Sequence, residues 1–389
     1  MPVVHQMRAG FAWRVACLYA ALFAANGIQL PFFPVWLKAK GLDAHEIGFV
    51  LAVPMLARII ATPLATRLAD RRDALREAIV LACALSVAGY LLVGLAQGAT
   101  AIIAAFAFAS LVYAPIMPIT ETYTLRGLSA RGRAYGPVRL WGSAAFVAGT
   151  FLAGFATDVI AARHLIWLIF AGMVLAALSA VMLEPLERDA ARVTTPVSPA
   201  KPLLRDKAFL AVIAAASLIQ ASHAVYYSFS ALAWRGEGLD GSAIAALWAL
   251  GVIAEIVLFA LSARLPPSIT PTRLLLIGAF GGALRWSAMA FNPPAAALPF
   301  LQVLHAATFG ATHLGALSYL ARHAPKGQAA TAQGYLAIAL AAAMAAATTL
   351  SGVLYQAAGP LSYAAMASIA VAGGLCALIA QRAGRVTAA

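Results

Sequence analysis

The sequence predicts an all-α membrane protein that crosses the bilayer twelve times. It has 389 residues, of which 63% are hydrophobic, and its mean hydropathy is +0.86. Only 11% of the residues are charged, against about 25% in a soluble domain, which is too few to cover a water-exposed surface. Apolar runs of about 20 residues with almost no charge indicate transmembrane helices. The shorter alternating segments of a membrane β-barrel are absent from the sequence.

The apolar runs are separated by clusters of glycine, proline and charged residues, such as KAKGLD, DRRD, RGEGLD and NPP. The first run has a basic start but no persuasive small-residue cleavage site, so we expect it to remain as a helix. The predicted spans are residues 11–36, 46–66, 76–96, 99–124, 135–157, 164–183, 208–233, 243–263, 273–291, 295–321, 329–355 and 360–381.

The basic residues are distributed unevenly between the loops. An even number of spans places both termini on one side, and 20 of the 27 lysines and arginines fall on that side. Four fall on the opposite side and three lie within spans. The positive-inside rule therefore predicts cytoplasmic termini. The same asymmetry accounts for the formal charge of +13 without a nucleic-acid partner.

A polar, proline-containing segment, EPLERDAARVTTPVSPAKPLLRDK, follows the sixth span. Its composition suits a flexible linker. We expect an N-terminal six-helix bundle over residues 1–184, a cytoplasmic linker over 185–207 and a C-terminal six-helix bundle over 208–389.

The two halves contain a weak internal repeat. Gly-Leu-Asp occurs at 41–43 and again at 238–240, an offset of 197 residues that also aligns Ile47 with Ile244. The same offset pairs Asn26 with His223 and Arg58 with Glu255. Duplicated helical bundles of this kind are the architecture of many secondary transporters.

Several ionisable residues fall inside the predicted spans. A charge at the bilayer centre costs at least about 2.5–3.5 kcal/mol on insertion scales, so such residues are rare unless they are used. They are Arg58, Glu121, Arg139, Glu255 and Arg285, together with His223, His305 and His313.

Glu121 and Arg139 are expected at similar depth on consecutive helices, where they can pair and bind substrate. Pro115 and Pro118 precede Glu121 and are expected to bend the fourth span. The alternatives are a purely structural pair and an Arg139 side chain that reaches to the membrane interface.

Glu255 is the only acid within a span of the second half, which suggests a proton carrier, with Arg285 and His313 as neighbours that tune it. The alternative is a static Glu255–Arg285 bridge that joins two helices. For the three histidines, the competing interpretation is a hydrogen-bonded side chain in the helix core. For Arg58, the competing interpretation is an ion pair with an acid of a neighbouring helix.

Aromatic residues are frequent on the first, fifth, seventh and eighth spans. Most are expected to pack or to face lipid, although those on the first and seventh spans are placed to line a pocket for a ring. They include Tyr19, Phe23, Phe32, Phe33, Trp36, Trp141, Tyr226, Tyr227, Phe229 and Trp248.

No cofactor or metal site is predicted. Cys17, Cys83 and Cys376 lie singly in apolar runs without metal or redox spacing. The chain contains no catalytic loop motif and no segment long enough for a soluble signalling domain, which disfavours a membrane-embedded enzyme and a sensor.

Four stretches together resemble the major facilitator superfamily, in particular its 3-phenylpropionate permease branch related to the lactose/proton symporter. They are GIQLPFFPVWLKAKGLDAHEIG, YGPVRLWGSAAFVAG, HAVYYSFSALAW with LWALGVIAE, and LRW followed by QVLHAATFGATHL. The resemblance implies two pseudo-symmetric six-helix bundles and proton-driven uptake of a small organic acid by alternating access. It implies a monomer in a bacterial inner membrane, with protons, a small solute and the lipid bilayer as its partners.

The resemblance also implies roles for individual residues. Glu121 and Arg139 match substrate-binding positions, and Glu255, Arg285 and His313 match a proton-coupling cluster. We add Asn26, His223 and Trp141 to the predicted binding residues, His305 to the coupling residues, and Asp70, Arg71 and Arg58 as gating residues.

The sequence departs from these relatives at two places. Ala316 stands where they carry a second acid after the helix-ten histidine, so coupling is expected to depend on Glu255. The superfamily's loop signature after the second span survives only partly: Asp70 and Arg71 remain, but Thr66 replaces the glycine. A sugar or nucleoside symporter and an efflux antiporter remain alternatives, although the fifth span lacks the GPxxGG run typical of antiporters.

Overall fold

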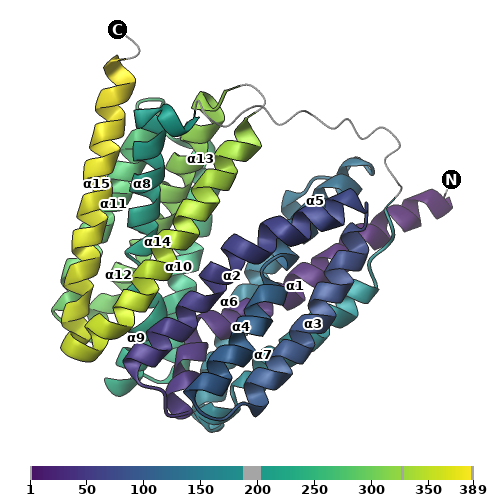
Figure 1. Ribbon diagram of the computed structural model, residues 1–389, viewed down its shortest axis with the longest axis horizontal. Coiled ribbons are helices and arrows are strands. Elements are labelled where there is room, and N and C mark those ends of the chain that lie inside the picture. The colour runs from purple at the N-terminus through teal and green to yellow at the C-terminus, as the bar shows by residue number, and fades with distance from the viewer. Residues whose placement is uncertain (1, 187–202, 326–327, 387–389) are drawn as a thin grey trace. The chain divides into compact units, whose positions relative to one another are not determined.

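A computed structural model describes residues 2–186, 203–325 and 328–386, and these residues form helices and connecting turns without strands (Figure 1). Short 3₁₀ turns occur between some helices, and one segment, Ala306–Ala311, is π-helical. The α-helices are α1 (Pro2–Ala39), α2 (Ala44–Arg71), α3 (Leu75–Leu95), α4 (Ala99–Tyr113), α5 (Ile116–Ser129), α6 (Gly136–Val159), α7 (Ile166–Val181), α8 (Lys207–Ala221), α9 (Ala224–Gly236), α10 (Gly241–Leu261), α11 (Pro271–Ala290), α12 (Leu298–Val303), α13 (Thr312–His323), α14 (Ala329–Ala358) and α15 (Ser362–Val386).

The helices confirm the predicted multi-pass membrane protein. Ten stretches of the described residues are long and apolar enough to cross a membrane. One of them, Thr331–Ala383, contains both α14 and α15, and the 20-residue α11 with its two arginines is not among the ten. Separating α14 from α15 and adding α11 gives the twelve predicted spans.

Three of the spans are built from more than one helix. The fourth is interrupted between α4 and α5 at Pro115, because proline has no N–H to continue the helical ladder. The seventh is interrupted at Ser222 and His223, between α8 and α9. The tenth consists of α12, the π-helical segment and α13. Such irregular backbone within a membrane is tolerated where protein or a cavity surrounds it.

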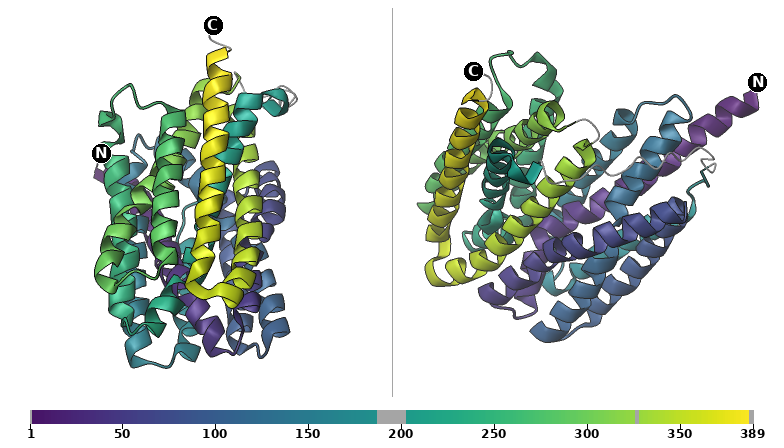
Figure 2. Two further views of the ribbon diagram at one scale, coloured as in Figure 1. Left: turned by 90° about the vertical axis from the view of Figure 1, so that its left-hand side faces the viewer. Right: turned by 45° about the horizontal axis from the view of Figure 1, so that its top comes forward.

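The chain divides into two compact units. Unit 1 comprises residues 1–192 and 234–245, and unit 2 comprises residues 193–233 and 246–389. Residues 187–202, most of the predicted linker, lie outside the described residues. Within unit 1, α1 packs along α6 and α7, and α3 packs against α4 and α7 (Figure 1). Within unit 2, α15 packs against α8 and α11 (Figures 1 and 2).

Glycines bring the backbones of α1 and α6 together. A Cβ atom placed on Gly27 would overlap the carbonyl of Phe146, and one placed on Gly149 would overlap the carbonyl of Ala24. The Thr150 hydroxyl donates to the Gly27 carbonyl at 3.0 Å. Small residues that allow close backbone approach are typical of helix pairs in membranes.

The two Gly-Leu-Asp segments form the same turn. Gly41 and Gly238 have positive φ values of 91° and 93°, a conformation that glycine adopts without steric cost. The aspartate that follows each turn accepts a backbone N–H three residues later, Asp43 from Glu46 and Asp240 from Ala243. The repeat read from the sequence is therefore also a repeat of backbone geometry.

The α1–α6 crossing yields a stability prediction. Gly149→Ala is expected to lower the free energy of unfolding by about 1–3 kcal/mol, because the added methyl group overpacks the contact. Gly334→Ala, in the interior of α14 with open space around its Cβ position, is the matched control and is expected to be neutral or slightly stabilising. Thermal unfolding in detergent measures both, and equal melting temperatures for the two variants would contradict the packing argument.

Candidate functional site

Arg139 lies in the first turn of α6 within unit 1, and its guanidinium rests on aromatic rings. The guanidinium carbon is 4.0 Å from the centre of the Phe23 ring and 5.5 Å from that of Tyr19. One turn later, a Cβ on Gly142 would lie 2.9 Å from Nη1 of Arg139, so the glycine leaves room for the folded-back side chain. Cation–π contacts of this kind are strongest where the pair is shielded from water.

The expected direct pairing of Glu121 with Arg139 is not seen. No ion pair within 4.0 Å joins the two side chains, both of which belong to the described residues. The two groups are still close enough for their charges to interact. Glu121 and Arg139 are partly buried and do not form a direct ion pair, so each can still contact a ligand. Their roles in binding stay predictions.

The other predicted residues of unit 1 are dispersed. Asn26 donates to the Tyr113 hydroxyl at 2.8 Å, and Arg58 is exposed but near enough to Tyr113 to interact electrostatically. Trp141 is 53% exposed and packs edge-on against Trp13 at 6.2 Å. A binding role for Trp141 stays a prediction.

The predicted gating residues Asp70 and Arg71 form the end of α2. The ion pair that the structure places beside this end joins Arg126 of α5 to Asp73 at 2.6 Å. Asp73 itself has a positive φ of 48° in the turn before α3. The pair fixes this turn to α5 within unit 1, and a gating role for Asp70, Arg71 or Arg58 stays a prediction.

Unit 2 brings together most of the predicted ionisable residues of the second half. At its centre Arg285 of α11 is 0% exposed. Its Nη2 donates to Oε1 of Gln302 at 2.6 Å, and its Nη1 lies 3.3 Å from Nδ1 of His305 and 3.4 Å from Oγ1 of Thr308. The guanidinium carbon is 4.7 Å from the Tyr226 ring and 4.5 Å from the Trp286 ring.

The contacts fix the direction of the hydrogen bonds around Arg285. Arginine can only donate, so Nδ1 of His305 accepts and the ring proton of a neutral His305 is on Nε2. That nitrogen faces Oε2 of Glu255 at 3.6 Å. The alternative of a static Glu255–Arg285 bridge is therefore not seen as a direct contact, because one imidazole lies between the two charges.

A second chain of hydrogen bonds leads from Arg285 to His223. Nδ1 of His223 faces the Gln220 carbonyl at 3.0 Å and must donate, so Nε2 of the neutral ring accepts from the Thr308 hydroxyl at 2.9 Å. The predicted binding residue His223 is thus a fully buried hydrogen-bonded histidine. His313 stacks on Phe309 at 6.2 Å and interacts electrostatically with Glu255.

The π-helical segment explains why these groups converge. It follows His305 and contains Thr308, and Gly278 of α11 packs directly against Thr312 at its end. Gly281 allows a second close approach, since a Cβ there would lie 3.2 Å from the Cβ of Ala307. Single π-helical turns occur frequently at functional sites.

Sequence reasoning missed Gln302 and Thr308. Both are fully buried and both contact Arg285. A signal was present, since Gln302, His305 and Thr308 recur every three residues and so share one side of a helix.

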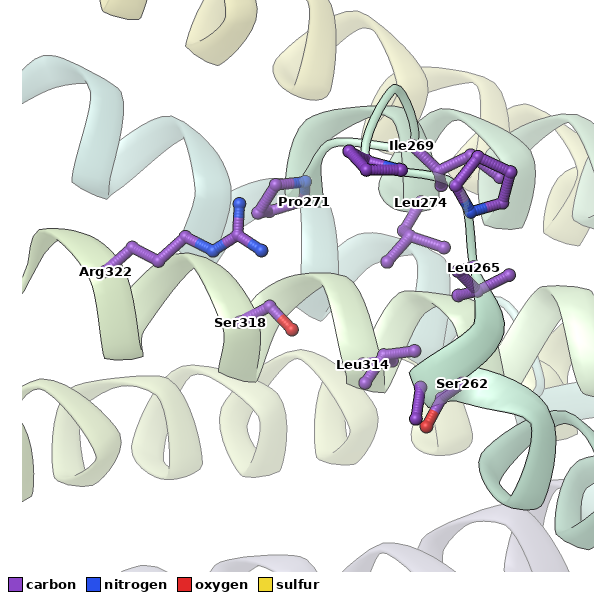
Figure 3. Close-up of a pocket in the computed structure, with 11 residues that line it drawn as sticks. Ser262, Leu265, Ile269, Pro271, Leu274, Leu314, Ser318 and Arg322 are labelled. Carbon is purple, nitrogen blue, oxygen red and sulfur yellow. The ribbon is translucent and has the colours of Figure 1, made fainter.

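A surface pocket of about 230 Å³ lies elsewhere in unit 2. Figure 3 shows it between the turn before α11 and the side chains of Leu314, Ser318 and Arg322 on α13. None of the predicted site residues lines it, so the pocket does not coincide with the buried cluster.

The fold is shared with solved transporter structures. Nucleoside transporter NupG superposes with a TM-score of 0.80 over 95% of this chain and 98% of its own, at 13% identity. A bacterial homolog of the human lysosomal transporter Spinster gives 0.73 over 97% of each chain, also at 13% identity. The chain thus shares its fold with these transporter structures.

The chain belongs to the MFS_1 like family, whose model matches residues 12–365. It is 33% identical over 361 residues to a probable 3-phenylpropionic acid transporter of Escherichia coli (strain K12), covering 91% of this chain and 93% of that protein. Maltose permease of Geobacillus stearothermophilus is 27% identical over 340 residues, with 84% of each chain covered. The protein is accordingly a membrane transporter for a small molecule and not an enzyme.

The contact between Gln302 and Arg285 can be tested by stability. Gln302→Leu is expected to lower the free energy of unfolding by about 1.5–3 kcal/mol, since a buried hydrogen bond to a charged group is lost. Gln97 also accepts from a cation, Lys40, at 3.0 Å, but on the surface. Gln97→Leu is expected to change stability by no more than about 0.5 kcal/mol. Thermal unfolding that ranks the two variants in the opposite order would show that the buried contact is not stabilising.

Proposed function

We propose that this protein carries a small aromatic carboxylate together with protons, exposing its binding groups to each side of the membrane in turn. The observation that carries the proposal is the link from Arg285 through His305 to Glu255. It joins a cation that does not lose its proton to a carboxyl group that can take one up. The link thus offers one group suited to an anion and one suited to a proton.

The nature of the solute is supported by the residues and by one relative. Arginine suits carboxylates because its N–H groups can form two parallel charge-assisted hydrogen bonds. The two arginines of the candidate sites, Arg139 and Arg285, both lie on aromatic rings, which offer packing surfaces for a ring of the solute. The relative that is 33% identical is named as a probable transporter of 3-phenylpropionic acid.

Glu255 is the proposed proton carrier. Its side chain keeps 18% of its surface exposed, and it touches His305 rather than a permanent cation. It can therefore change its protonation state without breaking an ion pair to arginine. His305 and His313 are proposed to tune it, while Arg139 and Glu121 of unit 1 are proposed to contact the solute.

Further proposals concern organisation and location. We propose a six-helix bundle on each side of a linker at 185–207, a bacterial inner membrane location, cytoplasmic termini and a monomeric state. The excess of basic residues in loops on the terminus side supports the orientation.

A neutral sugar is the second candidate solute, favoured by the 27% identity to maltose permease. A fully buried guanidinium that no carboxylate of the described residues touches argues for an anion instead. Uptake measurements with both kinds of solute distinguish the two candidates.

The function is tested with purified protein in liposomes. An imposed pH step, acidic outside, is expected to drive saturable accumulation of labelled 3-phenylpropionate, and a protonophore is expected to abolish it. Protein-free liposomes are the necessary control, because the protonated acid also crosses lipid unaided. If only maltose or a nucleoside accumulates, the proposed solute is wrong.

Glu255→Gln separates coupling from binding. The amide keeps the shape of the carboxyl group but cannot carry a proton, so gradient-driven accumulation is expected to fall at least tenfold. Exchange of external labelled against internal unlabelled 3-phenylpropionate needs no net proton movement and is expected to persist. The matched control is Glu237→Gln at an exposed acid, for which accumulation should be normal. Undiminished accumulation in Glu255→Gln would exclude Glu255 as the proton carrier.

A further inference from the structure

The environment of Arg285 lacks a negative charge. A guanidinium stays protonated in proteins, and burying it without a countercharge costs several kcal/mol. The groups that hold it are neutral: they are acceptors from Gln302, Thr308 and His305, the Tyr226 hydroxyl and the faces of two rings. The nearest acid, Glu255, is reached only through His305.

The remaining titratable groups nearby do not supply the missing charge. Tyr226, Tyr227 and Tyr363 interact with the guanidinium, but tyrosine is neutral at physiological pH. His223 and His305 are neutral in the hydrogen-bond arrangement above. Within the described part of unit 2, Arg285 is therefore an uncompensated cation.

Three buried hydrogen-bond donors of unit 2 also lack an acceptor, two on Arg285 and its partner Gln302 and one on Trp248, whose ring stacks on Tyr226. They are Nε of Arg285 itself, the amide nitrogen of Gln302 and the indole nitrogen of Trp248, all buried and without a partner among the described residues. Buried donors in folded proteins are nearly always paired. A set of unpaired donors beside an uncompensated cation is what a bound anion would satisfy.

Several aromatic rings lie next to the Arg285 guanidinium. Tyr226, on which the guanidinium rests, stacks on Trp248 with ring centres 4.6 Å apart and planes at 22°. Trp286, which also contacts the guanidinium, stacks on Tyr363 at 5.8 Å. An anion that reached the guanidinium would therefore meet ring faces next to it.

We propose that Arg285 is the receptor for the carboxylate of the transported solute, with Gln302 and Trp248 as additional donors and the aromatic side chains around the guanidinium as neighbours of its ring. The inference rests on the proposed function and assigns to unit 2 an anion site distinct from Arg139. His305 has one nitrogen toward this site and the other toward Glu255, so anion and proton are held on opposite sides of one imidazole.

The negative charge of the bound solute would offset the positive charge of the Arg285 guanidinium. Bound anion would thus lower the electrostatic cost of bringing a proton to Glu255, which is one imidazole away. Binding of each cargo then favours binding of the other, as reciprocal linkage requires.

The experiment is equilibrium binding of labelled 3-phenylpropionate to the purified full-length protein, compared with its uncharged amide. The wild-type protein is expected to bind the acid at least tenfold more tightly than the amide. Arg285→Gln should weaken binding of the acid at least tenfold and remove the preference, whereas Arg322→Gln, at an exposed arginine of α13, should leave both affinities unchanged. Arg139→Gln is measured in parallel.

Gln302→Glu tests the anion site in a variant that is expected to fold, so that lost binding cannot be attributed to unfolding. The new carboxylate would pair with Arg285 from within the protein, so the variant is expected to melt no lower than wild type. It is also expected to bind 3-phenylpropionate at least tenfold more weakly, because the receptor is already occupied. Trp248→Phe keeps the ring stack, loses the N–H and is expected to bind several-fold more weakly.

The outcomes separate this inference from the proposed function. If Gln302→Glu and a folded Arg285→Gln both bind the acid within twofold of wild type, the anion site at Arg285 is wrong although transport of the acid stands. If wild-type protein binds neither the acid nor the amide, the proposed solute itself fails and the anion site fails with it. Loss of acid binding in Arg139→Gln alone would place the receptor in unit 1.

Discussion

The second half of this transporter is arranged around one constraint, a guanidinium that is fully buried and keeps its charge. Removing such a group from water is costly, and the structure compensates with the acceptors Gln302, His305 and Thr308 and with two ring faces instead of a carboxylate. The small residue Gly278 and the π-helical segment bring α11 close enough for these contacts.

Arg139 in the first half is only partly buried, but its guanidinium is also held by aromatic rings. Its guanidinium rests on Phe23 and Tyr19, and the acid of that half, Glu121, interacts only from a distance. A cation locked in a close ion pair has its charge cancelled by its own protein. A cation held by ring faces and neutral acceptors keeps its charge available for a ligand.

The repeat shows which features persisted and which diverged between the halves. The turns at Gly41 and Gly238 share their backbone conformation and their aspartate cap. The aligned residues Asn26 and His223, however, serve different hydrogen bonds, the first to Tyr113 and the second to Gln220 and Thr308. Backbone geometry was kept while the polar chemistry of each half changed.

The sequence by itself determined the helices, the interruption at Pro115 and the set of charges inside the membrane. These depend on hydropathy and on local backbone chemistry, which a short window of sequence contains. Only the tertiary structure decided the partners. It separated Glu121 from a direct pair with Arg139, put His305 between Glu255 and Arg285, and added Gln302 and Thr308 to the buried cluster. Partner choice depends on the rotation of each helix about its axis and on small residues that set the approach between helices, and neither is encoded by any single segment.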